Sequence, residues 1–361
     1  MTLPSLKIGN LVARVPIIQG GMGIGVSLSK LAAAVANEGG IGVISAVQIG
    51  FRENDFKIDN DAANIRGLIK EIRRARDLSP DGILGVNILA AVNNYKDMVK
   101  AAIKEKIDLI ISGAGLPKNL PELIKGSKTK IAPIVSSGKA ASVITKLWNR
   151  KYNYLPDAII VEGSEAGGHL GFSLEQLTSI PKIDFYSIVQ EVLTEIRPFE
   201  EKFKKKIPVI VAGGIFNGSD IAKYLKAGAA GVQISTRFVA TEECDAHINF
   251  KKAYIAANEK DIQIVKSPVG MPGRAIRNDF VKSLEKGKIP VERCYNCLKP
   301  CNPATTPYCI SDALIRSVEG DAENGLVFVG TNAYRMNKIV TVKELMNELV
   351  IEAEQALNIS D

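Results

Sequence analysis

Eight short, almost wholly apolar segments recur along the first two thirds of this chain, and amphipathic segments with helical periodicity separate them. A short apolar run without polar alternation is typical of a strand that is buried on both faces of a parallel sheet. Eight such strand–helix units predict an α/β protein built on a (β/α)8 barrel, the TIM fold, whereas an open doubly wound sheet more typically has fewer strands. The expected strands are residues 15–20, 41–45, 83–88, 109–113, 131–136, 158–163, 208–214 and 231–235.

The pattern changes after Phe238, where helical stretches continue without clear strand–helix alternation. We therefore expect three parts: a barrel over 1–240, a smaller, mainly helical substrate or lid domain over the barrel mouth at 241–340, and a C-terminal helix at 341–361 that packs back on the barrel. Ser27 is expected to cap the first barrel helix. Helices are expected over residues 28–37, 60–77, 95–104, 139–148 and 219–226.

The net charge is +7, from 46 Lys and Arg against 39 Asp and Glu, which is small for 361 residues. The basic runs at 73–76 and 202–206 fall in helical segments, where a solvated face is expected, so we expect no nucleic-acid partner.

The apolar runs are too short and too rich in glycine to cross a bilayer, and no secretory pattern begins the sequence. Five cysteines, an odd number, favour a reducing compartment. We expect a cytoplasmic protein.

Glycine dominates the expected strand ends, which form the open face of a barrel and carry its working residues. Glycine is costly in ordered structure unless the backbone turns sharply or approaches a ligand closely. Several glycine-rich loops on one face therefore indicate a flat or phosphorylated ligand. The candidate residues at these strand ends are Gln19, Gly20, Gly21, Met22, Gly23, Asn87, Ser112, Gly113, Glu162, Gly167, Gly168, His169, Ala212, Gly213, Gly214, Ser235 and Thr236.

The last two strand ends are the commonest phosphate site of this fold. Gly213 and Gly214 offer approachable backbone amides, and Ser235 and Thr236 offer amides and hydroxyls. The glycine loop after the first strand lacks the G-x-G-x-x-G spacing, and no acid ends the second strand, which argues against a Rossmann-type dinucleotide site.

His169 is one of only two histidines, and it follows the sixth strand at the open face. An imidazole at that place suits proton transfer or the stabilisation of an anion. His247 lies beyond the barrel in a stretch of mixed polarity and is interpreted as a surface or structural residue.

Four segments, 16–23, 162–169, 212–215 and 231–238, together resemble the nitronate monooxygenase (2-nitropropane dioxygenase) family, which is related to the FMN-dependent enoyl-acyl-carrier-protein reductase II. The resemblance implies an FMN-containing barrel with a small substrate domain. It implies that the Gly20–Gly23 loop and Asn87 contact the isoalloxazine and ribityl parts, and that Ser112 and Gly113 line the same pocket. It assigns the phosphate end to Gly167, Gly168, Gly213, Gly214, Ser235 and Thr236. Gln19, Glu162, Ala212 and Gln233 join the cofactor set within these motifs, and His169 matches the active-site histidine.

The resemblance implies two activities that the matched motifs do not separate. The first is oxidation of an alkyl nitronate, with O2 completing the conversion to a carbonyl compound and nitrite. The second passes a hydride from NAD(P)H through FMN to an enoyl thioester, and an acidic acyl-carrier partner would then meet a basic rim. A flavin-free barrel that binds a phosphorylated metabolite is the third hypothesis, and a homodimer is left open. The expected rim residues are Arg274, Arg277, Lys282, Lys286 and Lys288.

Four cysteines fall close together with the spacing C-x2-C-x3-C-x7-C: Cys294, Cys297, Cys301 and Cys309. Such a cluster is compatible with an iron–sulfur cluster or zinc, and equally with an ordered loop whose thiols are simply buried. The resemblance implies a family that needs only FMN. Whether these four cysteines bind a metal is therefore not decided by the resemblance. Cys244 stands apart and is expected to be inert.

Overall fold

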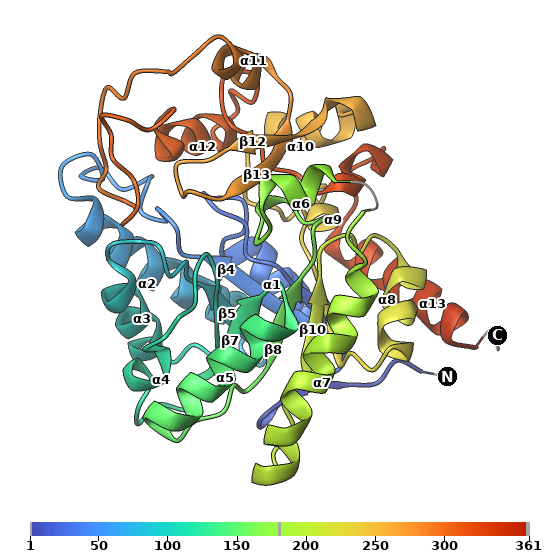
Figure 1. Ribbon diagram of the computed structural model, residues 1–361. Helices are drawn as coiled ribbons and strands as arrows, with labels where there is room; N and C mark the ends of the chain where they lie inside the picture. The colour runs from blue at the N-terminus through green and yellow to red at the C-terminus, as the bar shows by residue number, and fades with distance from the viewer. Residues whose placement is uncertain (1, 180–181, 359–361) are drawn as a thin grey trace.

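The computed structural model describes residues 2–179 and 182–358, so residues 1, 180–181 and 359–361 of the expected parts lie outside the described residues. Eight parallel strands close into a barrel with helices around it, as Figure 1 shows, which confirms the predicted (β/α)8 fold. In the order in which they neighbour one another, the strands are β10 (Val209–Ala212), β11 (Gly231–Ile234), β3 (Ile17–Gln19), β4 (Ile41–Ser45), β5 (Ile83–Asn87), β6 (Leu109–Ser112), β7 (Lys130–Val135) and β8 (Ile159–Glu162).

The barrel strands have short, apolar sequences because both of their faces are buried. One face meets the surrounding helices, and the other fills the barrel interior with side chains such as Ile18, Ile111 and Ile210. The hairpin of β1 (Leu6–Ile8) and β2 (Leu11–Ala13) adds Leu6 and Ile8 to this inner cluster. The helices around the barrel are α1 (Ser29–Asn37), α2 (Asn60–Leu78), α3 (Tyr95–Lys104), α4 (Leu120–Leu123), α5 (Gly138–Tyr152), α7 (Phe185–Phe203), α8 (Gly218–Lys226) and α9 (Thr236–Val239). The short helix α6 (Leu174–Thr178) has no buried residue.

The predicted cap of α1 is wrong. The hydroxyl of Ser27 accepts a hydrogen bond from the Met22 amide at 2.8 Å and so holds the loop after β3. The carboxylate of Asp245 instead accepts from the amides of Leu28, at 2.8 Å, and Leu31, at 3.3 Å. A residue far along the chain therefore provides the negative charge at this helix N-terminus.

The segment after the barrel contains a β-hairpin that the sequence analysis did not predict. Strands β12 (Ile262–Lys266) and β13 (Pro272–Ile276) are antiparallel, and β9 (Gly168–His169), which follows β8, pairs with β13 as a third strand. Figure 1 shows this sheet and the helices α10 and α11 above one end of the barrel. The other elements of this segment are α10 (Ile248–Ala256), η1 (Glu259–Asp261), α11 (Asp279–Glu285), α12 (Ile310–Val318) and η2 (Thr331–Arg335).

The last described helix, α13 (Val342–Asn358), packs against α8 and α1. The approach to α8 is so close that a Cβ atom on Gly218 would lie 2.2 Å from the backbone nitrogen of Ala353. Leu345 and Leu349 are fully buried in this contact. Within the described ranges, no helix is long and apolar enough to span a membrane.

Candidate functional site

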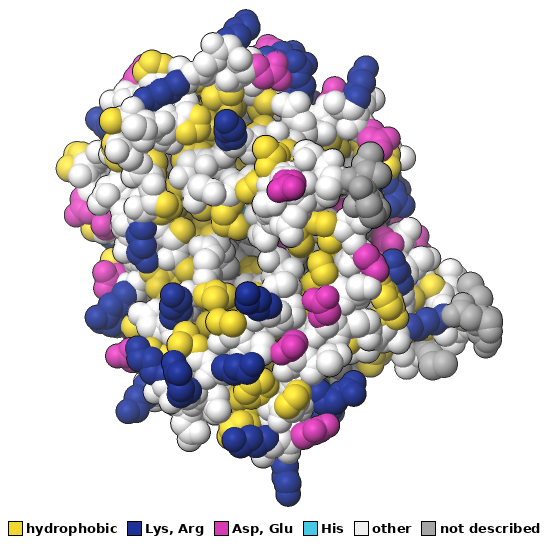
Figure 2. Space-filling model, in the orientation of Figure 1, with side chains coloured by type: hydrophobic (Ala, Val, Ile, Leu, Met, Phe, Trp, Pro, Cys, Tyr) yellow, Lys and Arg dark blue, Asp and Glu magenta, His cyan; other side chains and the backbone are white. Residues whose placement is uncertain are grey.

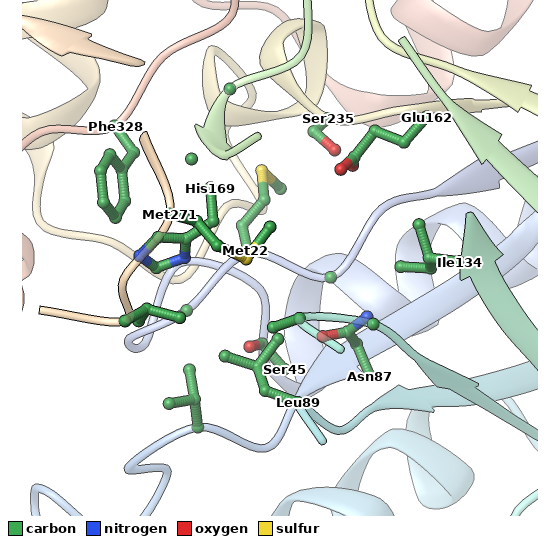
Figure 3. Close-up of a pocket in the computed structure, with 18 of the residues that line it drawn as sticks. Met22, Ser45, Asn87, Leu89, Ile134, Glu162, His169, Ser235, Met271 and Phe328 are labelled. Atoms are coloured by element: carbon green, nitrogen blue, oxygen red, sulfur yellow. The ribbon is translucent and has the colours of Figure 1, made fainter. Parts of the chain in front are cut away.

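A cavity of about 340 Å³ opens at the carboxyl ends of the barrel strands. Its walls come from the ends of β4, β5, β7, β8 and β11, from the loop after β3, and from the segment that follows the barrel. In Figure 3, Glu162 and Ser235 lie on one side of the cavity, and His169 lies on the opposite side with Phe328 and Met271. The barrel thus supplies one wall, and the later segment supplies much of the other.

Two thirds of the candidate residues predicted from the sequence line this cavity, and they come from five separate loops. The lining members are Gly21, Met22, Gly23, Asn87, Gly113, Glu162, Gly167, Gly168, His169, Gln233, Ser235 and Thr236. The members that lie outside its wall are Gln19, Gly20, Ser112, Ala212, Gly213 and Gly214.

The side chains of Gln19 and Ser112 hold the barrel together rather than face the cavity. Both are fully buried. The side-chain Oε1 of Gln19 accepts from the Val43 backbone amide at 3.0 Å, and the Ser112 hydroxyl donates to the Ile88 backbone carbonyl at 2.8 Å. Gly213 and Gly214 have φ values of +90° and +84°, which only glycine adopts without strain. The Gly214 backbone carbonyl accepts from the side-chain Nδ2 of Asn332 at 2.8 Å.

The loop after β3 approaches its neighbours so closely that side chains are excluded from it. A Cβ atom on Gly20 would lie 2.3 Å from Ser235 Oγ, and one on Gly21 would lie 2.4 Å from Asn87 Cβ. These contacts are far inside van der Waals separation, so the glycines let the loop backbone form the cavity wall beside Asn87 and Ser235.

His169 is held in place by both the barrel and the hairpin. As part of β9 it is paired with Gly273 of β13, and its Nε2 lies 2.7 Å from the hydroxyl of Ser267. The ring of Phe328 packs edge-on against the imidazole with 5.1 Å between centroids. Burial lowers the pKa of His169 to about 4, so the imidazole is neutral at pH 7. Ser267 and Phe328 carry no motif, and sequence reasoning missed them.

Glu162, the last residue of β8, is the one acidic side chain among the described residues that line the cavity. The described residues give its carboxyl group neither a hydrogen bond nor an ion pair. Enclosure in the cavity raises the pKa of Glu162 to about 7, because burial disfavours the charged form. No Lys or Arg of the described chain lines the cavity.

Most of the remaining wall is apolar, which favours a ligand with an alkyl or acyl portion. These side chains come from the barrel loops and from the later segment in similar measure, and they are Ile24, Val26, Val47, Leu89, Leu116, Ile134, Val135, Phe250, Val269, Met271, Leu298, Ile310, Leu314 and Phe328.

The clustered cysteines do not form a metal centre in this structure. Among the described residues, no group of three or more His, Cys, Asp or Glu side chains is placed to hold a metal ion. Cys297 lines the cavity and accepts a hydrogen bond from the Ser311 hydroxyl at 3.3 Å, whereas Cys294 is exposed. Cys244 is buried, and burial raises its pKa to about 12.

The basic rim expected around residues 274–288 is wrong at its first member. Arg274 is buried, and its guanidinium donates to the carbonyls of Ser164, at 2.7 Å, and Ala166, at 2.6 Å. Arg277 and Lys282 are paired with acids on α11, and Lys288 donates to the carbonyl of Ala304. Arg274 therefore stabilises the loop between β8 and β9 and is not available at the surface.

The chain belongs to the nitronate monooxygenase family, which its sequence matches over residues 5–352. It is similar to a probable nitronate monooxygenase of Staphylococcus aureus (strain Newman), with 29% identity over 301 residues, 76% of this chain and 79% of that protein. Among solved structures, FabK from Thermotoga maritima matches with a TM-score of 0.74 and 29% identity over 96% of this chain and 94% of that chain. A nitroalkane oxidase from Streptomyces ansochromogenes shares the fold, with a TM-score of 0.73 and 22% identity over 95% and 96% of the two chains.

These findings confirm the family resemblance and the barrel class. They also confirm that the chain is an oxidoreductase of this family.

Proposed function

We propose that this chain is an FMN-dependent oxidoreductase that oxidises alkyl nitronates with O2 to carbonyl compounds and nitrite. The observation that carries the proposal is one cavity with a glycine-rich polar wall on one side and a neutral, half-buried histidine on the other. The polar wall suits a flat, hydrogen-bonding cofactor, and the histidine then faces the substrate. The membership of the nitronate monooxygenase family supports the proposal.

The polar wall has unused hydrogen-bonding groups that fit FMN. The side-chain carbonyl of Gln233 is buried without a hydrogen-bond partner, a state that costs about 1–3 kcal/mol. The ring N–H and ribityl hydroxyls of FMN are donors that would satisfy it. Asn87, Ser235 and Thr236 line the same wall and add amide and hydroxyl groups. The residues that would hold FMN are therefore these four with Gly21, Met22, Gly23, Gly113, Gly167 and Gly168.

Bound FMN would supply the electron-accepting chemistry. The chain's own residues orient the substrate and handle its proton. The apolar wall binds the alkyl group and excludes water. His169, neutral at pH 7, accepts the proton from the α-carbon of a neutral nitroalkane or donates a hydrogen bond to an oxygen of a nitronate. The contact with Ser267 fixes the ring orientation for that task.

The second candidate is an enoyl-thioester reductase that draws its electrons from NAD(P)H. It is favoured by the absence of any Lys or Arg from the described cavity lining, because a neutral acyl chain needs no counter-ion and a nitronate anion does. The similarity to FabK from Thermotoga maritima supports it too.

An absorption spectrum followed by two anaerobic additions tests the proposal. The purified protein, with added FMN, is expected to show the two flavin bands. Bleaching of these bands by propyl-2-nitronate, with nitrite formed on admitting air, supports the first candidate. Bleaching by NADH or NADPH alone, reversed by a crotonyl thioester, replaces it with the second. A colourless protein that takes up no FMN removes both and favours a barrel for a phosphorylated metabolite.

A further inference from the structure

One wall of the cavity is a single face of α12. The α12 residues that line the cavity are Ile310, Ser311, Leu314 and Ser317. Their spacing places them on one side of the helix, and Ser317 lies seven residues beyond Ile310. Seven residues correspond to about 10 Å of helix rise. The cavity wall therefore continues along α12 for about two turns.

The cavity ends where this face of α12 ends. The loop after β3 also lines the cavity, with Ile24 and Val26. Between them, a Cβ atom on Gly25 would lie 3.5 Å from Cγ1 of Val318, so the loop packs against α12 just past Ser317. Ser317 and Val318 are both buried, and solvent does not reach the cavity from this end. The result is a closed groove, named the α12 groove, which is formed by the described face of α12 with Ile24, Val26, Phe250 and Tyr254.

The serine hydroxyls of α12 are already used within the protein. The Ser317 hydroxyl donates to the carbonyl of Leu326 at 2.7 Å. The Ser311 hydroxyl donates to Sγ of Cys297 at 3.3 Å and accepts from Nε2 of Gln48 at 3.1 Å. A polar ligand group in the α12 groove would therefore lose its hydration without a partner, whereas an alkyl chain gains free energy by leaving water.

The α12 groove begins beside His169. The ring of Phe328 packs against the imidazole with 5.1 Å between centroids, and the hydroxyl of Tyr254 on α10 donates to the carbonyl of Phe328. Figure 1 shows α10 and α12 above the same end of the barrel. In Figure 2, hydrophobic side chains border the hollow between this segment and the barrel. A substrate that reacts at His169 can thus extend its chain into the groove.

We propose that the α12 groove binds the alkyl chain of the substrate and selects chains of up to about eight carbons. The position of the reacting end rests on the proposed function, whereas the length of the chain rests on the groove itself. C–C bonds of about 1.5 Å advance by less than their length along a zigzag chain, so about eight carbons span about 10 Å. A short nitroalkane such as nitroethane leaves the groove unfilled and forgoes this burial of apolar surface.

Straight-chain alcohols from butan-1-ol to decan-1-ol test the groove, because they carry the chain and undergo neither candidate reaction. Their binding to the purified protein with saturating FMN is measured by isothermal titration calorimetry. Each added methylene is expected to tighten binding about fourfold as far as octan-1-ol. Decan-1-ol is expected to bind no more tightly than octan-1-ol. An affinity that stops rising at pentan-1-ol would overturn the proposal.

Two tryptophan variants on opposite faces of α12 locate the chain. Leu314→Trp fills the groove and is expected to weaken octan-1-ol binding at least about tenfold, with butan-1-ol binding changed by less than about twofold. Arg316→Trp, at an exposed position of the same helix, is the matched control and should change neither. Circular dichroism checks that both variants are folded. Equal effects of the two variants on octan-1-ol binding would overturn the proposal.

Leu314→Ala tests the same position without adding bulk. The smaller side chain enlarges the groove, so the chain-length limit is expected to move from octan-1-ol to decan-1-ol. A limit that stays at octan-1-ol would show that Leu314 does not contact the chain and would contradict the proposal.

Turnover separates this inference from the proposed function. The value of kcat/KM for nitronates prepared from 1-nitropropane to 1-nitrooctane is expected to rise in the same order as the alcohol affinities. Chain-length-dependent binding of the alcohols without any turnover of nitronates would overturn the proposed function and still support the groove. Equal kcat/KM values for all chain lengths would overturn the groove.

Discussion

Glu162 and His169 face the same cavity, and burial pushes both towards their neutral forms. Neutral groups are what an apolar cavity tolerates, because an unpaired charge there loses its hydration. Two ionisable groups of the cavity therefore have pKa values in inverted order, the carboxyl at about 7 and the imidazole at about 4. Each gives a measurable pH signature.

The carboxyl group of Glu162 should make the protein less stable as pH rises. A folded-state pKa of about 7 against an ordinary value of 4.5 means that the folded chain holds an extra proton between these pH values. The free energy of unfolding should therefore fall as pH rises from about 5 to about 8. In Glu162→Gln this contribution should disappear. Urea unfolding of the two proteins across that pH range, without flavin, measures the difference, and parallel curves would contradict it.

His169 should act on the substrate and leave the cofactor bound. His169→Ala is expected to lose about 100-fold or more in kcat/KM at an unchanged ratio of flavin to protein. Because the pKa of the imidazole is about 4, the rate in a Glu162→Gln background should stay flat from pH 8 down to about pH 5. Steady-state rates with nitroalkane across this range provide the measurement. A fall in the rate with an apparent pKa near 6.5 would show that burial does not lower the pKa of this imidazole, and would contradict the prediction.

Ser267 should matter through His169. Ser267→Ala removes the hydroxyl at 2.7 Å from Nε2 and is expected to lower kcat by about tenfold with little change in flavin affinity. Ser283→Ala, at a hydroxyl that bonds within α11, is the matched control and should have wild-type kcat. Equal rates for the two variants would remove Ser267 from the positioning of the histidine.

At the scale of elements, the loop between β8 and β9 depends on a residue more than a hundred positions away. Arg274 of β13 donates to two carbonyls of that loop, and the loop leads directly to His169. Arg274→Met should cost about 3 kcal/mol of stability, because a buried charged donor is lost and its acceptors are left unpaired. Arg277→Met, at an exposed pair, should cost less than about 0.5 kcal/mol. Urea unfolding of both variants, with kcat, measures the contrast.

Some of these elements could be predicted from the sequence and others could not. The barrel strands were predictable because each is buried on both faces and so has an uninterrupted apolar sequence. The hairpin was not predictable, because β13 contains Pro272, Gly273 and Arg274, which are untypical of a strand. The guanidinium of Arg274 is buried where it donates hydrogen bonds to the distant β8–β9 loop, a partner that no local pattern reveals. For the site, strand-end positions indicated the barrel wall. Ser267, Met271 and Phe328 reach the cavity only through tertiary packing that no local pattern encodes.

At the scale of the whole molecule, α13 ties the end of the described chain to the barrel. Leu349 is fully buried there, whereas Ile351, two residues further on, is 55% exposed. Leu349→Ala should therefore lower the free energy of unfolding by about 2–5 kcal/mol, and Ile351→Ala by less than about 0.5 kcal/mol. Urea unfolding followed by circular dichroism compares them. Equal losses would mean that the helix packs differently from the structure.

The pairing of β9 with β13 bears on how this kind of protein diversifies. The strand that carries His169 pairs with backbone from the segment that also lines the His169 side of the cavity. Recombination that exchanged this segment with one from a divergent relative would import a new pocket and, in the same event, reset the position of the histidine. Selection for new substrates is therefore expected to act through point substitutions at the cavity wall rather than through exchange of whole modules.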